Sequence, residues 1–122
     1  MKLRIARHTN NLEAITTFYT KIIGLEVLGA FENHADYNGV FIGKKNQDWH
    51  LEFTQSNEVP SHIFDEDDLF VFYIQTQKEL NIILKKLKEN NIAKVLPKKP
   101  YWLKNGETYL DPDGYRIVLC KI

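Results

Sequence analysis

The chain contains the stretch Tyr109-Leu110-Asp111-Pro112-Asp113-Gly114-Tyr115-Arg116-Ile117-Val118-Leu119, and this stretch decides the fold. The residues Asp111 to Gly114 predict a tight turn, because proline presets φ, aspartate side chains bond the nearby backbone and glycine accepts a positive φ. The alternation from Tyr115 to Leu119 predicts a strand with one buried face. A turn and a strand alone indicate only a hairpin, so the preceding elements are needed to identify the fold.

The composition is that of an ordinary globular protein, with 43% hydrophobic and 26% charged residues among 122. Sixteen basic residues balance sixteen acidic ones, so no net field attracts nucleic acid or an anionic membrane. No apolar run approaches the roughly 20 residues that span a bilayer. The single Cys120 cannot form an internal disulfide, and no signal peptide is visible. We therefore predict a cytoplasmic protein with neither nucleic-acid nor membrane partners.

The first half of the chain predicts a strand, a helix and three further strands. Asn10 and Asn11 can cap a helix whose apolar residues recur at helical spacing, and Gly24 can supply the left-handed residue that ends it. The predicted elements are a strand over Leu3–Thr9, a helix over Leu12–Ile23, and strands over Leu25–Phe31, Gly39–Gly43 and Trp49–Gln55.

The same order recurs after Ser56–Asp68, an acidic, proline-containing segment without periodicity that we interpret as a linker. Thr76-Gln77-Lys78-Glu79 is a capping box, and the helix that it begins is predicted to end at Asn90-Asn91. The predicted strands of this half are Leu69–Gln75, Ile92–Leu96, Tyr101–Leu103, Glu107–Leu110 and Tyr115–Lys121. Apart from one additional short strand in the second half, the chain therefore predicts an α+β fold made of two tandem βαβββ modules.

Four stretches carry a resemblance to a known family: Arg7-His8-Thr9-Asn10-Asn11-Leu12, Phe18-Tyr19, Gly24-Leu25 and Asp111-Pro112-Asp113-Gly114-Tyr115. In this order and at this spacing they resemble the vicinal-oxygen-chelate superfamily, which includes glyoxalase I, extradiol dioxygenases, fosfomycin-resistance enzymes and bleomycin-resistance proteins. The resemblance spans essentially the whole chain. It implies a single domain over residues 1–122, with module one at about 1–55, a linker at about 56–68 and module two at about 69–122. The modules would form a curved, half-barrel sheet around a cleft, and the resemblance also implies a homodimer.

The resemblance assigns four metal-ligand positions, a His or Gln on the first strand and a Glu on the last strand of each module. These positions fall on Arg4, Glu52, Leu69 (or Val71, if the alignment slips by two) and Val118. Only Glu52 matches, because a guanidinium has no lone pair for a metal and aliphatic side chains cannot ligate. We therefore expect no resident metal or other cofactor, and none of the metal-dependent proton transfer of the family.

The period of two along each strand predicts which side chains face the cleft. With Glu52 facing inward, His50 faces inward as well, and the resemblance places Trp102 at the cleft mouth. The predicted ligand-binding residues are Arg4, His50, Glu52, Tyr73, Trp102 and Arg116. Guanidinium groups pair with carboxylate or phosphate, and aromatic rings stack on planar groups. We predict that the cleft binds a small organic molecule, anionic or aromatic, as in proteins of the bleomycin-resistance type, and we assign no catalytic residue.

Three alternatives stay open at this stage. Arg4 and Glu52 could form a structural ion pair that replaces a lost metal. Trp102 could pack against neighbouring residues rather than stack on a ligand. A divalent metal displaced to His50, Glu52 and His8 would instead support a lyase or a dioxygenase with a rearranged site around Glu52.

Overall fold

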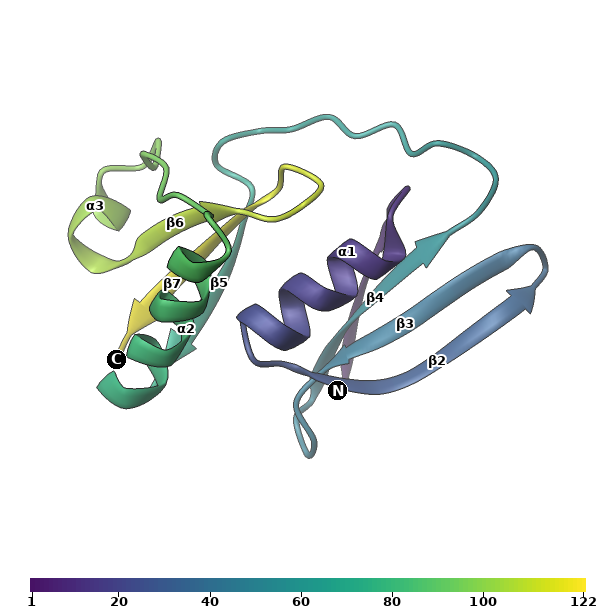
Figure 1. The fold of residues 1–122 in the computed structure, drawn as a ribbon, viewed down its shortest axis with the longest axis horizontal. Coiled ribbons are helices and arrows are strands. Elements are labelled where there is room, and N and C mark those ends of the chain that lie inside the picture. The colour runs from purple at the N-terminus through teal and green to yellow at the C-terminus, as the bar shows by residue number, and fades with distance from the viewer. The chain divides into compact units, whose positions relative to one another are not determined.

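The computed structural model describes all residues from Met1 to Ile122. The chain divides into two compact units, Met1–His62 and Ile63–Ile122 (Figure 1). Each unit has its own sheet with helical segments, and neither sheet closes on itself, so the predicted two-module α+β fold is confirmed. No helix is long and apolar enough to cross a membrane.

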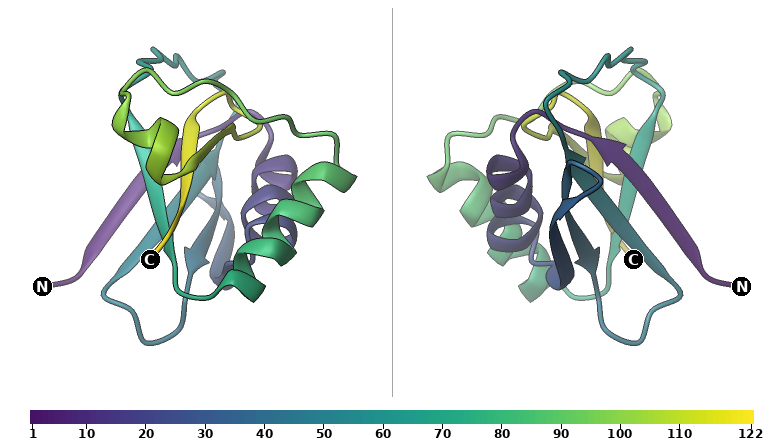
Figure 2. Two further views of the ribbon diagram at one scale, coloured as in Figure 1. Left: turned by 90° about the vertical axis from the view of Figure 1, so that its left-hand side faces the viewer. Right: turned by 90° about the vertical axis from the view of Figure 1, so that its right-hand side faces the viewer.

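The first unit contains a four-stranded sheet with one helical segment against it. Its elements are β1 (Leu3–His8), α1 (Leu12–Thr17), the π-helix η1 (Phe18–Ile22), β2 (Glu26–His34), β3 (Tyr37–Gly43) and β4 (Trp49–Gln55). The strand order is β1-β4-β3-β2, with β1 parallel to β4 and the other pairs antiparallel. β1 is therefore an edge strand, and the N-terminus lies at its free end (Figure 2).

The helix of the first unit is anchored at its start and changes type halfway. The Asn11 side chain accepts a hydrogen bond from the Ala14 N–H at 3.0 Å, which caps α1. Gln55, the last residue of β4, accepts from the Leu12 N–H at 2.9 Å and so fixes the helix start to the sheet. The predicted single helix over 12–23 is corrected, because the α-helix passes into a π-helix at Phe18. Gly24 then ends the segment with a φ of +89°, as predicted.

The strand register separates the two faces of the first sheet. Leu51 and Phe53 are buried beneath the helix, where Phe53 stacks on Tyr19 with ring centroids 5.1 Å apart. His50 and Glu52 alternate with these residues and therefore lie on the opposite, open face. The predicted orientation of this strand is confirmed.

The second unit contains a three-stranded sheet and two helices. Its elements are β5 (Leu69–Ile74), α2 (Gln77–Glu89), α3 (Tyr101–Asn105), β6 (Glu107–Leu110) and β7 (Arg116–Lys121). The strand order is β5-β7-β6, with β5 parallel to β7. The predicted capping box is confirmed in part, because the Thr76 hydroxyl accepts from the Glu79 N–H at 3.1 Å at the start of α2.

Two predicted strands of the second unit are wrong. Ile92–Leu96 contributes only a single bridge, between Val95 and Thr108, because the segment is confined between Asn91, with a φ of 57°, and a proline that has no N–H to donate. Tyr101–Leu103 belongs to α3, because Pro100 fixes a helical φ of −57° and its carbonyl accepts from the Leu103 N–H at 3.1 Å. The second sheet therefore has one strand fewer than the first.

The turn at Asp111–Gly114 is formed as predicted. The buried Asp111 carboxylate accepts hydrogen bonds from the backbone N–H of Asp113 at 2.9 Å and of Tyr115 at 3.1 Å. Gly114 has a φ of +94°, which favours glycine. The turn delivers the chain into β7, whose residues from Ile117 to Cys120 are all buried.

Candidate functional site

Three predicted site residues meet on the open face of the first sheet. Arg4 on β1 is in register with His50 on β4, and Ala6 is in register with Glu52. Arg4 Nε donates a hydrogen bond to His50 Nε2 at 2.9 Å, and Arg4 Nη1 lies 3.9 Å from Glu52 Oε1. The guanidinium carbon also lies 4.7 Å from the centroid of the Phe41 ring. Arg4 is therefore held by protein groups on three sides.

The hydrogen bond from Arg4 fixes the protonation of His50. A guanidinium can only donate, so His50 Nε2 accepts and the ring carries its proton on Nδ1. Burial lowers the pKa of His50 below 6.5, the neighbouring Arg4 and Lys2 lower it further, and Glu52 opposes them. His50 is therefore a neutral imidazole near pH 7, with an Nδ1–H that can donate to a ligand.

A basic cavity of about 310 Å³ opens beside His50. It is lined by Lys2, Leu28, Lys44, Lys45, Asn46, Gln47, Trp49 and His50, which come from the turn between β3 and β4 and from the adjoining strand ends. Lys44 donates to the Gly24 carbonyl at 2.8 Å, whereas the ammonium groups of Lys2 and Lys45 have no protein partner. The backbone N–H of Lys45 lies 3.3 Å from Glu26 Oε2, so one carboxylate adjoins the turn.

Sequence reasoning missed the three lysines of this cavity. The available signal was the basic, polar run Lys44-Lys45-Asn46-Gln47 between two predicted strands. Lys2 joins this turn only because β1 pairs in parallel with β4, so that Leu3 is opposite Trp49. A pairing between segments this distant is not visible in local periodicity.

The predicted residues of the second unit lie on one face of its sheet. Trp102 is 8% exposed and packs against Val118 and Cys120, with Leu69 and Val71 partly buried against the same cluster. Arg116 Nη1 donates to the Leu96 carbonyl at 2.8 Å, and its Nη2 lies 3.8 Å from Glu66. Tyr73 is largely exposed. Within this unit, Trp102 and Arg116 are thus engaged by other protein groups, whereas the Tyr73 side chain is largely exposed to solvent.

The side chains at the four family ligand positions do not fit a metal quartet. Arg4 lies against Glu52, the one matching residue, and places a positive charge there. Val118 is fully buried under Trp102, beside Leu69 and Val71, so the corresponding positions of the second unit are apolar. No three His, Cys, Asp or Glu side chains form a group that could hold a metal ion.

The alternative ligand set of His50, Glu52 and His8 is not assembled either. His8 Nδ1 lies 2.9 Å from the Thr54 hydroxyl, and its Nε2 lies 3.1 Å from both the Ser56 hydroxyl and the Glu58 carbonyl. Both ring nitrogens of His8 therefore have partners at the far end of β1. In the register, His8 is opposite Thr54, four residues along β4 from His50.

Comparison of the sequence and the fold with known proteins identifies the family of this chain. A family model described as the YycE-like N-terminal domain matches residues 3–54, and one described as the YycE-like C-terminal domain matches residues 67–121. The chain is 41% identical over 118 residues to the uncharacterized protein YycE of Bacillus subtilis (strain 168), which covers 96% of this chain and 85% of that protein. The crystal structure of YycE, a candidate glyoxalase/fosfomycin resistance protein of unknown function, superposes with a TM-score of 0.88 at 40% identity, over 98% of this chain and 88% of that one.

More distant structures share the fold. The trypanothione-dependent glyoxalase I of Leishmania major has a TM-score of 0.76 at 23% identity, over 99% of this chain and 86% of that one. TnmS3, an antibiotic binding protein from Streptomyces sp. CB03234, has a TM-score of 0.69 at 17% identity, over 99% of this chain and 94% of that one. With the two-module fold and the full-length family match, these similarities confirm the resemblance seen in the sequence: the chain belongs to the YycE-like family of the vicinal-oxygen-chelate superfamily.

Proposed function

We propose that the protein binds a small organic molecule bearing an anionic group, and that this group is held in the basic cavity beside His50. The observation that carries the proposal is that Lys2 and Lys45 both line this cavity and that their ammonium groups have no protein partner. Clustered cations attract an anion, and an anion in the cavity would relieve their mutual repulsion.

The cavity also offers groups that suit an organic ligand. His50 lines the cavity, and it keeps an Nδ1–H that is available to donate, because its Nε2 accepts from Arg4. Trp49 and Leu28 also line the cavity and provide apolar groups there. A carboxylate, phosphate or phosphonate carried on a small apolar body therefore matches the lining, with lysines as charge partners and His50 as a directional donor.

The residues at the four family ligand positions support a protein that binds its ligand without metal-dependent catalysis. Three of those four positions carry Arg4, an aliphatic residue of β5 and Val118, which cannot ligate. Among the structural relatives, TnmS3 is an antibiotic binding protein, which supports a binding role on this fold. We infer that the basic cavity of the first unit is used for capture rather than for catalysis.

The test is a titration of ¹⁵N-labelled protein with phenylphosphonate, followed through the indole N–H signals. Trp49 lines the cavity and Trp102 is buried in the second unit, so the two indoles provide a reporter and an internal reference. We expect a saturable shift of Trp49 alone, and a much weaker effect of benzyl alcohol. A Lys2→Gln/Lys45→Gln variant should lose most of the phosphonate affinity.

The matched control is Lys78→Gln/Lys88→Gln, which removes two exposed charges from the helix α2 and keeps the same net charge change. Equal phosphonate affinity in the cavity variant and the control would refute the anion site. The proposal that the protein works without a bound metal is tested separately, by titration with Mn²⁺, Ni²⁺ and Zn²⁺. Tight, stoichiometric metal binding that is abolished by Glu52→Ala would overturn this proposal and support the lyase or dioxygenase alternative.

A further inference from the structure

His50 belongs both to the basic cavity and to the open face of the first sheet. It lines the cavity, and its ring makes a T-shaped contact with Phe41 on the open face, with the two centroids 5.8 Å apart. Its Nε2 accepts a hydrogen bond from Arg4, whereas its Nδ1 has no protein partner. One ring nitrogen is therefore engaged by the protein and the other remains for a ligand.

The Arg4 side chain is held in position by contacts rather than by burial, since it is 52% exposed. Arg4 Nη1 lies 3.9 Å from Glu52 Oε1, and the guanidinium carbon lies 4.7 Å from the centroid of the Phe41 ring. Arg4 is in register with His50, and Phe41 is in register with Glu52, so these side chains share the open face. The donor that reaches His50 Nε2 is thus in place before a ligand binds.

The neutral imidazole of His50 has two tautomers, which offer a ligand opposite chemistry at Nδ1. With the proton on Nδ1 the ring donates there, and with the proton on Nε2 it accepts there instead. The guanidinium of Arg4 can only donate, so its hydrogen bond is compatible with the Nδ1–H form alone. When only a fraction of the protein is in the binding-competent form, the apparent Kd rises by the reciprocal of that fraction.

We propose that Arg4 is a positioning residue that sets the specificity of the basic cavity, because it holds His50 in the Nδ1–H form. This inference rests on the proposed function and adds the class of group that the cavity takes at His50. That group is a hydrogen-bond acceptor, an oxygen of an ionised carboxylate, phosphate or phosphonate. A ligand that presents an N–H or O–H to His50 is rejected, because two donors would then face each other. Arg4 acts through His50 and does not need to touch the ligand.

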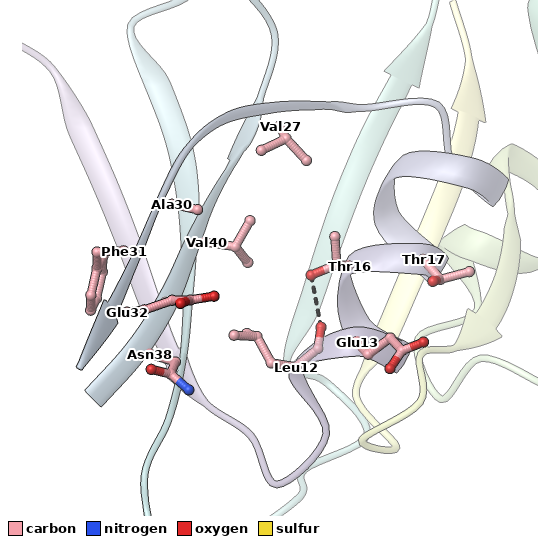
Figure 3. A pocket seen from close by; sticks show the side chains of 11 residues that line it. Leu12, Glu13, Thr16, Thr17, Val27, Ala30, Phe31, Glu32, Asn38 and Val40 are labelled. Carbon is pink, nitrogen blue, oxygen red and sulfur yellow. Dashed lines mark hydrogen bonds between the residues drawn. The ribbon is translucent and has the colours of Figure 1, made fainter. Parts of the chain in front are cut away.

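A larger groove on the helix side of the first sheet does not compete for an anion. It has a volume of about 440 Å³ and lies between the start of α1 and the strands β2 and β3, where Figure 3 shows Val27, Ala30 and Val40. The groove stays open because α1 packs chiefly against β3 and β4, and only the π-helix η1 contacts β2 closely. The charged residues that line it are Glu13 and Glu32, which repel an anion. The backbone amide of Ala30 therefore provides an internal reference for anion binding.

The experiment measures the His50 tautomer and the affinity for phenylphosphonate in the same samples. It uses ¹⁵N-labelled full-length protein at pH 8, above the ordinary histidine pKa of about 6.5, so that the two ring-nitrogen signals show which nitrogen carries the proton. We expect the Nδ1–H form in the ligand-free protein and a mixture of both forms in Arg4→Met. If about one fifth of the imidazoles keep the Nδ1–H form in this variant, the apparent Kd should rise about fivefold from this cause. Arg4→Lys keeps the positive charge, and its Kd should again follow the measured tautomer fraction.

A second background separates the tautomer from the charge that Arg4→Met also removes. His50→Asn supplies an amide N–H near the position of Nδ1, and an amide side chain has no tautomers to choose between. In the His50→Asn background, Arg4→Met should weaken phosphonate binding by less than about twofold, which is the effect of one exposed charge. The Ala30 amide should stay unshifted in every variant.

Three results would overturn the inference. They are a proton on His50 Nε2 in the ligand-free native protein, a Kd that does not follow the tautomer fraction across the Arg4 variants, and equal losses from Arg4→Met with His50 and with His50→Asn. If phenylphosphonate leaves the Trp49 indole of the native protein unshifted, the proposed function itself fails, and the role of Arg4 fails with it. The two failures are distinguishable, because the tautomer is measured without a ligand.

Discussion

Gly106→Ala should destabilise the protein for a purely steric reason. Gly106 joins α3 to β6 with a φ of −171° and a ψ of 179°, an extended conformation that any residue adopts. A Cβ at this position would lie 2.7 Å from Val118 Cγ1, 2.9 Å from the Leu119 carbonyl oxygen and 3.4 Å from Trp102 Cε3. The substitution therefore tests the packing of the cluster that occupies the family ligand positions of the second unit.

The size of the effect follows from which neighbour can move. Val118 is fully buried, and Leu119 is in register with Glu107 in the β6–β7 ladder, so neither atom can retreat freely. Overpacking of a core costs about 1–3 kcal/mol, and a contact with fixed backbone belongs in the upper half of that range. We expect a loss of about 2 kcal/mol, which lowers Tm by roughly 8 °C for a chain of this size.

The assay is urea and thermal unfolding followed by far-UV circular dichroism, with Gly29→Ala as the matched control. A Cβ at Gly29, on the strand β2, would meet only a Phe41 ring atom at 3.3 Å, so this control should change stability little. In a Val118→Ala background, Gly106→Ala should cost less, because the Cγ1 contact is gone, but the contact with the carbonyl keeps part of the penalty. Equal stabilities of Gly106→Ala and Gly29→Ala would refute the reasoning.

Three further outcomes are expected. Thr108→Val should raise the free energy of unfolding by about 1 kcal/mol in urea titrations, because the buried Thr108 hydroxyl has no hydrogen-bond partner. Arg4→Met should raise the pKa of His50, because it removes a positive charge beside the imidazole, and Glu52→Gln should lower this pKa, because it removes a negative charge. NMR titration of the imidazole Cε1–H signal measures both pKa changes. The pKa of His50 is lower in the folded protein than in the unfolded chain, so the unfolded chain binds more protons just below pH 6.5. The free energy of unfolding should therefore fall as the pH drops below 6.5. His50→Gln should weaken this fall, as measured by urea titrations at pH 5.5 and 7.5.

Local chemistry made much of the fold predictable. The turn at Asp111–Gly114 has few alternatives, because the proline, the aspartates and the glycine each favour the same backbone path. Thr76 and Asn11 likewise begin helices through hydrogen bonds to residues three positions away. The alternation around Glu52 gave the correct faces of β4, because burial on one side imposes a period of two.

The errors arose where tertiary contacts outweigh local preference. Tyr101–Leu103 has strand-like aromatic and apolar residues, yet Pro100 starts a helical turn and burial of Trp102 holds it. The basic cavity depends on the pairing of β1 with β4, and the groove depends on how far α1 extends over β2. Neither can be read from the sequence, because each is set by packing between distant segments.

The parallel pairing of β1 with β4 also matters while the protein is being made. Arg4 meets His50, 46 residues further along the chain, and Leu69 of β5 meets Arg116 of β7 after a similar interval. A ribosome adds about 5–20 residues each second, so each leading strand waits roughly 2–9 s for its partner to be synthesised. During that time the backbone N–H and C=O groups of β1 have no ladder to join, and the nascent chain exposes an unpaired strand to chaperones and to other chains. The duplicated architecture imposes this delay twice in every round of translation.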